Sequence, residues 1–281
     1  MSKYLSKHGS KKSSTRPTNG KKSDSLASQA YDAEPADIDF EEQSSIEGTR
    51  FQDVITILYG PPKIGKSTTM SKFPGVYFLP TEPGYKVLDV RKTYIPNWIT
   101  FIEFVKKMEK SPKLIATVKV WAVDTADNLA KFCMLYTCGR SGTSHPSDEE
   151  WGKGWEAFGD EFAHWVGRLV SLGPGITFVC HEQDREVISR SMKITKSTPS
   201  IPKTCYHFIN NLSDIILHMT YVKKVDRQKL DLEPGVTRCV FTKPTEDQDA
   251  GDRTHRLPSV IPFKTEQELV DKIIRAFRKG D

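Results

Sequence analysis

The sequence predicts an α/β fold in which a mostly parallel sheet is flanked by helices and preceded by a disordered tail. Short β-branched apolar runs alternate with segments of helical periodicity, which is typical of a parallel sheet with crossover helices. A glycine-rich turn separates the first of these strands from the first helix, and residues 1–44 contain almost no large apolar side chains. We therefore divide the chain into a charged tail, 1–44, and one folded domain, 45–281.

Composition excludes several classes of protein. The 281 residues include 41 Lys and Arg against 36 Asp and Glu, which gives a net charge of +5, and 37% of them are hydrophobic. No apolar run approaches the roughly 18 to 20 residues that a membrane helix needs. The five cysteines are widely spaced and form no CxxC pair, so neither a disulfide framework nor a zinc ribbon is predicted. We expect a cytoplasmic protein with no membrane partner.

The tail consists of two blocks of opposite charge. Residues 1–22 carry seven Lys or Arg and no acid, whereas residues 23–42 carry seven Asp or Glu and no base. Burial of so few apolar side chains cannot offset the entropy of ordering the segment, so we expect it to be disordered. A solvated tail is the simpler interpretation, and an arm whose basic block contacts nucleic acid is the alternative.

A phosphate-binding loop opens the folded domain. The apolar run at 54–59 suits a buried strand and leads directly into GPPKIGKST, which is the GxxxxGK[ST] pattern between a strand and a helix start. Glycines allow backbone N–H groups to approach an anionic phosphate with no Cβ in the way. The predicted nucleotide-binding residues are Gly60, Pro61, Pro62, Lys63, Ile64, Gly65, Lys66, Ser67 and Thr68.

Three side chains around this loop have predicted roles in binding ATP and Mg²⁺. Lys66 would reach the β and γ phosphates, and the Ser67 hydroxyl would ligate Mg²⁺. An apolar strand at 118–123 ends in Asp124, which would hold the same metal through a water or hold Ser67. The sequence thus predicts a metal site made by Ser67 and Asp124.

A second strand places a carboxylate near the same edge. The helix after the loop must be short because Phe73, Pro74 and Gly75 end it, and 76–79 is the next apolar run. That run leads into the turn containing Glu82, and open α/β sheets bind ligands at the carboxyl ends of their strands. Glu82 is either the base that orients an attacking water or a surface turn residue.

The middle of the chain predicts helices and a polar loop. The pattern TFIE at 100–103 resembles a capping box and predicts a helix to about residue 110. We expect a helix at 126–138 and a mobile polar loop at 139–151. The aromatic and aliphatic residues between 155 and 169 recur at helical spacing, and we interpret them as core packing rather than as a base-stacking surface.

A further apolar strand, 176–180, ends in a polar group, and a basic segment follows. His181 or Gln183 would suit a sensor of the γ-phosphate, although a histidine hydrogen-bonded at a strand end is an equal alternative. We interpret 185–203 as a flexible loop that either tracks a nucleic-acid backbone or is only solvated. Its cations, opposed by a single acid at 186, are Arg185, Arg190, Lys193, Lys196 and Lys203.

The C-terminal part predicts a strand pair and a final helix. Residues 214–222 and 236–241 read as the strands, separated by a polar turn at 223–235. A second capping box, at 265–268, precedes a helix with one apolar face.

Taken in order, these segments resemble a RecA-type P-loop NTPase core. More narrowly, they resemble the phage nucleotide-binding proteins grouped as single-strand annealing or recombination ATPases. The resemblance covers about residues 52–263 and rests on the motifs GPPKIGKST, TEPG at Glu82, VWAVDT at Asp124, WGKGW at 151–155, FVCHE at His181 and DRTHRLP at Arg253.

The resemblance carries further expectations about the site. It implies that Glu82 activates water, and that loops near 139–151 and 185–203 bind single-stranded DNA. It also implies that a basic residue from a neighbouring subunit completes the ATP site. Arg253 matches that motif only in part, because Gly251 stands where a lysine is expected, and Lys243 is a second candidate.

We therefore expect a DNA-dependent ATPase that binds single-stranded DNA and promotes annealing or recombination in phage DNA metabolism. It would use ATP and Mg²⁺ and act as a homo-oligomer, either a ring or a filament, in the host cytoplasm. A single-strand-binding protein is a further candidate partner. The alternatives are a RecA-core helicase or helicase loader, a P-loop kinase acting on a small molecule, and an ATP-bound scaffold.

Overall fold

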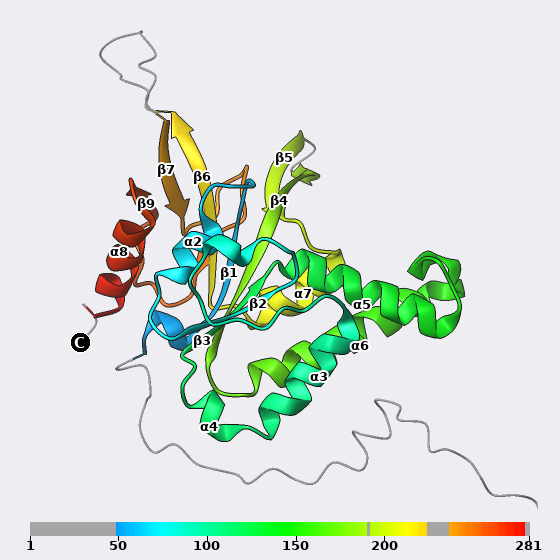
Figure 1. Cartoon of the computed structure of the whole chain (residues 1–281). Helices are drawn as coiled ribbons and strands as arrows, with labels where there is room; N and C mark the ends of the chain where they lie inside the picture. The colour runs from blue at the N-terminus through cyan, green and yellow to red at the C-terminus, as the bar shows by residue number, and fades with distance from the viewer. Residues whose placement is uncertain (1–48, 190–191, 224–235, 279–281) are drawn as a thin grey trace, which may run out of the picture. The chain divides into compact units, whose positions relative to one another are not determined.

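One sheet of nine strands forms the centre of the described chain (Figure 1). The computed structural model describes residues 49–189, 192–223 and 236–278. The expected tail, 1–44, residue Arg190 and most of the expected turn at 223–235 lie outside the described residues. All the described residues belong to the unit Glu41–Asp281.

The sheet is mostly parallel, as the sequence predicts. Its order is β2-β3-β4-β1-β6-β7-β9, with β5 paired to β4 and β8 paired to β6. The strands from β2 to β6 are parallel, whereas β7 and β9 join antiparallel at one edge. The strands are β1 Ile55–Gly60, β2 Val76–Pro80, β3 Val120–Asp124, β4 Gly175–Ser189, β5 Met192–Pro199, β6 Ile215–Lys223, β7 Val236–Phe241, β8 Gly251–Asp252 and β9 Val260–Phe263.

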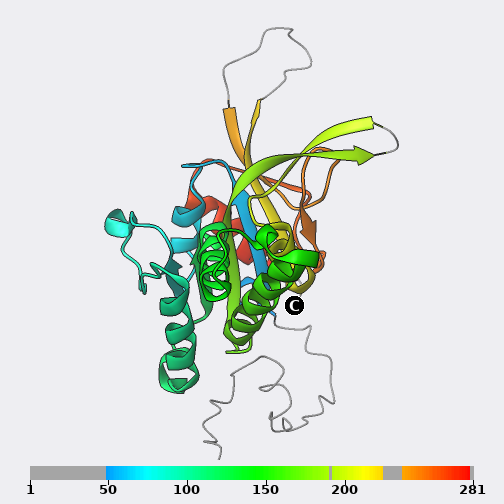
Figure 2. The ribbon, with the colours of Figure 1, turned by 90° about the vertical axis from the view of Figure 1, so that its right-hand side faces the viewer.

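Helices cover both faces of this sheet. The α-helices are α2 Lys66–Ser71, α3 Trp98–Glu109, α4 Pro112–Ile115, α5 Ala126–Ser141, α6 Lys153–Val170, α7 Lys203–Leu212 and α8 Glu266–Arg278. Short 3-10 helices are η1 Phe51–Asp53, η2 Tyr85–Val87, η3 Pro146–Asp148 and η4 Glu150–Gly152. Figure 2 shows α5 and α6 in front of the sheet and α8 behind it. The architecture is that of a P-loop NTPase core.

Two apolar cores follow from this layering. Successive side chains of a strand point to opposite faces, so Ile57 and Tyr59 pack with α3, α5, α6 and α7, while Leu58 packs with α2 and α8. The aromatic stripe of α6 belongs to the first core, where Phe158 and Phe162 are fully buried, which confirms its interpretation as packing. Each such side chain contributes roughly 1.5–3 kcal/mol by burial.

Two predictions for the middle of the chain are wrong in detail. Helix α3 begins at Trp98, because the Asn97 side chain caps it by accepting the Thr100 N–H at 2.9 Å. The expected mobile loop at 139–151 is largely helical: α5 continues to Ser141, and η3 and η4 follow. The helix ends where Gly142 adopts a φ of 73°, a conformation that glycine reaches without a Cβ clash.

The largest correction concerns 185–203, which is no flexible loop. Strand β4 does not end at Cys180 but continues to Ser189, and β5 returns alongside it. The two strands form a hairpin that projects beyond the sheet (Figures 1 and 2), and α7 follows it. The lysine, serine and threonine residues of this segment are typical of a loop. In the structure, however, apolar residues such as Val187 and Ile194 pair in register across the hairpin.

The remaining C-terminal predictions agree with the structure. Strands β6 and β7 form the expected strand pair, which is antiparallel. Helix α8 is capped by Thr265, whose Oγ1 accepts the Glu268 N–H at 3.2 Å. The five cysteines are free and buried. Among the described residues, no helix has the length and apolar character needed to cross a membrane.

Candidate nucleotide-binding site

The loop between β1 and α2 is shaped by two glycines. A Cβ on Gly60 would lie 2.1 Å from the Met219 carbonyl oxygen, so only glycine allows β1 to pack this closely against β6. Gly65 has a φ of 111°, in the region that disfavours a side chain. Lys63 also has a positive φ, 63°, which is uncommon outside glycine and marks a tightly curled loop. These residues give the segment the curvature that a phosphate cradle needs.

The side chain of Lys66 lies inside this loop. Its Nζ donates to the Gly60 carbonyl at 2.7 Å and to the Pro61 carbonyl at 2.9 Å, so one of its three donors is left for an anion. Burial lowers the pKa of Lys66, although the Asp124 carboxylate acts in the opposite direction. The ammonium is therefore held at the loop in a fixed position before any phosphate arrives.

Ser67 and Asp124 are brought together as the sequence predicts. The Ser67 hydroxyl donates to Asp124 Oδ2 at 2.5 Å, and the Asp124 side chain is buried at the end of β3. Tyr85 donates its hydroxyl to the same oxygen. Burial raises the pKa of Asp124, while the hydrogen bonds from Ser67 and Tyr85 lower it. The sequence analysis does not identify Tyr85 as a site residue. The feature that points to it is its place in the turn TEPGY, three residues after the predicted base Glu82.

A hydrogen-bonded network holds the turn that carries Glu82. The Thr81 N–H donates to the Asp124 carbonyl at 2.8 Å, and the Thr125 N–H donates to the Thr81 hydroxyl at 2.9 Å. Asn128 donates from Nδ2 to the Thr81 carbonyl at 3.0 Å. The peptide bond between Asp124 and Thr125 is cis. Glu82 itself is exposed, so its carboxylate is accessible to water while its backbone position is set by Thr81.

His181 is oriented by a carboxylate that the sequence analysis did not single out. Its Nδ1 lies 2.9 Å from Asp127 Oδ2, and its backbone N–H donates to the other Asp127 oxygen at 3.3 Å. His181 pairs in register with Gly60, the first residue of the loop. Gln183, the other predicted sensor, donates from Nε2 to the Pro199 carbonyl at 2.9 Å and serves the hairpin instead.

A cavity of about 390 Å³ joins these groups. It lies where the parallel strands end, which is where open α/β sheets bind their ligands. The residues that line it are Pro62, Lys63, Gly65, Lys66, Ser67, Thr68, Glu82, Pro83, Gly84, Tyr85, Leu88, Asp124, Thr125 and His181. Gly60, Pro61 and Ile64 of the predicted loop do not line this cavity. The predicted base, cation, metal ligands and histidine sensor therefore share one cavity.

The residues present fit a nucleotide-bound magnesium ion. Mg²⁺ prefers oxygen ligands and is usually held by one or two protein groups together with substrate phosphates. The Ser67 hydroxyl and the Asp124 carboxylate supply such oxygens at 2.5 Å from each other. Among the described residues, no group of three His, Cys, Asp or Glu side chains forms a metal site of its own.

The two predicted trans-acting residues do not line the cavity of their own chain. Arg253 forms an ion pair with Asp214 at 3.5 Å, and Asp214 accepts the Ile55 N–H at the start of β1. Arg253 is thus at the opposite end of β1 from the loop, a strand length of about 20 Å away. Lys243 follows β7 and does not line the cavity either.

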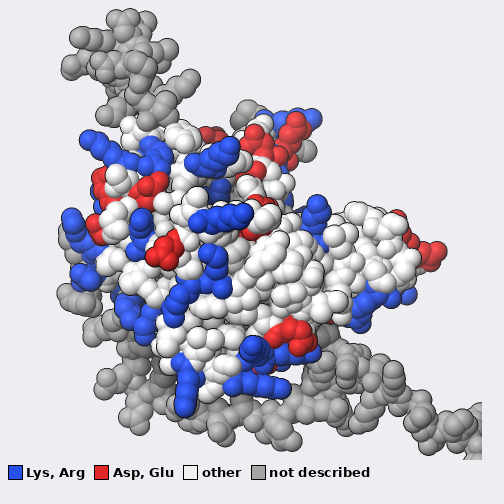
Figure 3. All heavy atoms as spheres, viewed as in Figure 1, with Lys and Arg blue, Asp and Glu red and all other residues white. Residues whose placement is uncertain are grey.

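The predicted DNA-binding cations are largely engaged within the protein. Lys196 forms an ion pair with Asp249 at 2.6 Å, and Lys193 pairs with Glu186 at 3.5 Å. Arg185 donates to the Ile201 carbonyl at 2.8 Å. Acidic and basic side chains both lie over the upper part of the molecule, around the hairpin, in Figure 3. Lys203 begins α7 and is exposed, and Arg190 lies outside the described residues.

Comparison with known proteins identifies the family. No curated protein matches the chain. The family model described as an AAA domain matches residues 52–254, which span the loop, Glu82, Asp124 and His181. The match supports ATP binding and hydrolysis as the activity of the cavity, with Mg²⁺ as the usual companion of the nucleotide. The chain belongs to the AAA domain family, the members of which are P-loop ATPases.

Proposed function

We propose that this ATPase binds single-stranded DNA and promotes annealing or recombination, and that it works as a homo-oligomer. The resemblance of its motifs to phage annealing and recombination ATPases supports a role in phage DNA metabolism. The Arg253 side chain is 64% exposed and does not line its own cavity, which leaves it accessible to a neighbouring subunit in such an oligomer.

The continuity of β4 is the observation that carries the proposal. The strand runs without interruption from Cys180 in the core, through His181 at the cavity, to the hairpin with Arg185. A γ-phosphate that moves His181 would therefore act on the same rigid element that carries the candidate DNA contacts. Loss of a γ-phosphate is a common way to release a switch segment.

One face of the hairpin suits a phosphate backbone. Arg185 and Lys196 lie directly opposite each other in the β4–β5 register, so their side chains share a face. Asp184 and Glu186 alternate with Arg185 and lie on the other face. A DNA phosphate would compete with Asp249 for Lys196. We therefore assign DNA binding to the face of Arg185 and Lys196.

Hydrolysis at the cavity requires positioning and charge neutralisation rather than a covalent intermediate. Lys66 would neutralise charge on the phosphates, and Glu82 would accept a proton from the attacking water. Magnesium, when bound with the nucleotide, would neutralise phosphate charge at Ser67 and Asp124. Asp127 holds His181 in one orientation beside these groups.

The test is the ATPase rate of the full chain with and without a single-stranded oligonucleotide, at two salt concentrations. We expect stimulation by the oligonucleotide and binding that weakens with salt. The absence of both stimulation and binding at low salt would exclude a DNA-dependent ATPase. Unwinding of a duplex would instead identify a helicase, and phosphate transfer to a metabolite rather than to water would identify a kinase.

A further inference from the structure

We propose that Arg238 is a positioning residue for the phosphate-binding loop, and that Glu266 and the Lys264 carbonyl orient it. This inference rests on the proposed use of the cavity for ATP. It gives the C-terminal helix a part in nucleotide binding, although Lys264 and Glu266 lie beyond the residues that match the AAA domain.

The guanidinium of Arg238 connects three segments. It projects from β7, where Nη1 donates to the Ile64 carbonyl at 3.2 Å and to Glu266 Oε1 at 2.5 Å. Its Nη2 donates to the Lys264 carbonyl at 2.5 Å, and its Cζ lies 4.8 Å from the centre of the Phe263 ring. Only a planar fork of donors reaches all of these acceptors at once, so the side chain has one orientation.

The Arg238–Glu266 pair forms the back wall of the loop at Gly65. A Cβ on Gly65 would lie 2.7 Å from Glu266 Oε1 and 3.1 Å from Arg238 Nη1. The bare Cα therefore packs against the ion pair, in addition to adopting a φ of 111°. The backbone conformation of Gly65 favours glycine, and a Cβ there would also displace the Glu266 carboxylate from Arg238.

The peptide between Ile64 and Gly65 is held on two sides. The Ile64 side chain is 1% exposed and packs in the same core as Leu269 and Val270 of α8. Its carbonyl is fixed by Arg238. Because α2 begins at Lys66, directly after this peptide, the direction of the peptide sets where the functional ends of Lys66 and Ser67 point.

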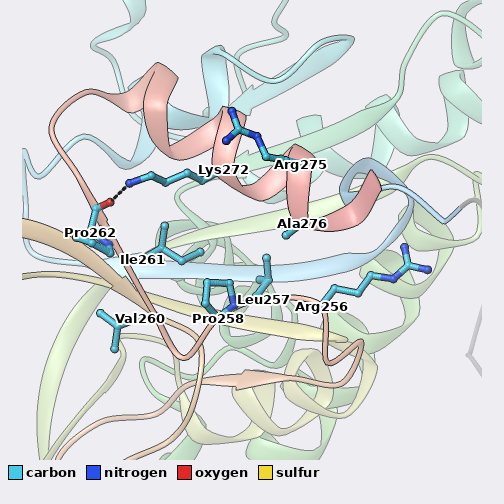
Figure 4. Close-up of a pocket in the computed structure, with 9 residues that line it drawn as sticks. All are labelled: Arg256, Leu257, Pro258, Val260, Ile261, Pro262, Lys272, Arg275 and Ala276. Carbon is cyan, nitrogen blue, oxygen red and sulfur yellow. Dashed lines mark hydrogen bonds between the residues drawn. The ribbon is translucent and has the colours of Figure 1, made fainter. Parts of the chain in front are cut away.

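Helix α8 is placed firmly enough to serve this role. Lys272 donates to the Pro262 carbonyl of β9 at 2.6 Å, as Figure 4 shows, and also pairs with Glu268 at 2.7 Å. A cavity of about 550 Å³ is lined by residues of both α8 and β9, whose apolar side chains otherwise pack in one core. Polar contacts add to this packing, and among them the bridge from Glu266 to Arg238 reaches the nucleotide loop.

The contribution of Arg238 is geometric rather than electrostatic. Glu266 neutralises its charge at 2.5 Å. Burial tends to raise the pKa of Glu266, but the hydrogen bond from Arg238 holds it below its usual value, so the carboxylate stays ionised at neutral pH. The two substitutions in this pair should then differ in effect. Removal of Arg238 frees the loop, whereas neutralisation of Glu266 leaves the bond to Ile64 in place.

The experiment measures the affinity of a fluorescent ATP analogue, and the melting temperature without nucleotide, for the full chain and its variants. Arg238→Gln should weaken nucleotide binding about tenfold, the effect of losing one charged hydrogen bond to the loop. Arg238→Lys should recover part of this loss. Arg275→Gln, on the exposed side of α8, is the matched control and should bind as the parent does. Glu266→Gln should stay within about threefold of the parent or bind more tightly.

The outcomes separate this inference from the proposed function. A parent protein that binds no ATP analogue would overturn the proposed function itself. A parent that binds, with Arg238→Gln binding equally well at a lower melting temperature, would leave Arg238 a purely structural role and overturn the inference. If Arg238→Gln does not fold, Arg238→Lys decides: an unchanged affinity in that variant overturns the inference as well.

Discussion

The nucleotide cavity and the β4–β5 hairpin share one strand but are stabilised in different ways. Around the cavity, the functional groups are buried or held by backbone atoms: Lys66 by two carbonyls, and Asp124 by two hydroxyls. On the hairpin, Lys193 and Glu186 are both largely exposed and form an ion pair with each other. The nucleotide cavity is therefore preorganised for its ligand. On the hairpin, a ligand must instead displace the carboxylates that already pair with the cations.

The largest expected effect is in the cavity, at Lys66. Lys66→Ala removes a buried cation that two loop carbonyls hold in place, so ATP affinity should fall at least about 100-fold. Equilibrium binding of ATP measures this. Lys72→Ala, an exposed lysine at the end of the same helix, is the control and should bind normally. Tight ATP binding by Lys66→Ala would show that the loop is not preorganised around this side chain.

The second effect separates binding from chemistry. Glu82→Gln keeps the shape of an exposed side chain whose backbone Thr81 positions, so ATP should bind as in the parent. Hydrolysis should slow by about 100-fold or more, because the base is lost. Single-turnover hydrolysis measures the change, with Glu103→Gln on α3 as the control. If Glu82→Gln hydrolyses ATP at the rate of the parent, Glu82 is a surface turn residue and not the base.

The sequence predicts the preorganised region better than the adaptable one, for a physical reason. Gly60 to Thr68 is contiguous, and its glycines are dictated by local backbone geometry, so a motif identifies it. Asp124 and Glu82 follow from the rule that parallel strands end at one edge. The side chains that support the site come from separate segments with no pattern of their own. Tyr85 contacts Asp124, Asp127 contacts His181, Asn128 contacts the Thr81 carbonyl, and Arg238 and Glu266 contact the loop.

The sequence of the hairpin predicts a loop because its charged and hydroxyl residues are also typical of loops. The register between β4 and β5 depends on pairing between two segments of the chain, and composition does not reveal that pairing. The helix start at Trp98 was missed similarly, because Asn97 competes with Thr100 as a cap and the burial of Trp98 favours the earlier start. In each case, tertiary packing selects between two locally acceptable choices.

A smaller effect tests how Tyr85 supports the metal ligand. Tyr85→Phe removes one hydrogen bond that favours the ionised form of Asp124, so the already raised pKa of that carboxyl should rise further. Because the ionised form is the one that binds metal, the acid limb of the ATPase pH profile should move to higher pH. The rate at neutral pH should fall about three- to tenfold. Tyr94→Phe, a partly exposed tyrosine, is the control, and an unmoved acid limb would contradict the role of Tyr85.

The smallest expected effect lies on the hairpin and has the opposite sign. Asp249 holds Lys196 at 2.6 Å and also accepts the Tyr206 hydroxyl at 3.1 Å. Asp249→Asn keeps an acceptor for Tyr206 but releases the charge of Lys196. Affinity for single-stranded DNA should then rise a few-fold, and the slope of log K against log salt should steepen by about 0.7, the value for one added phosphate contact.

The exposed pair on the same hairpin provides the control for that prediction. Glu186→Gln frees Lys193 from a pair at 3.5 Å in which both side chains are more than 70% exposed, at 76% and 73%. Such pairs contribute little in water, so the salt slope should change less than in Asp249→Asn. Equal affinities and equal slopes in the parent and in Asp249→Asn would mean that Lys196 makes no contact with DNA. The DNA contact would then have to lie away from the face shared by Arg185 and Lys196.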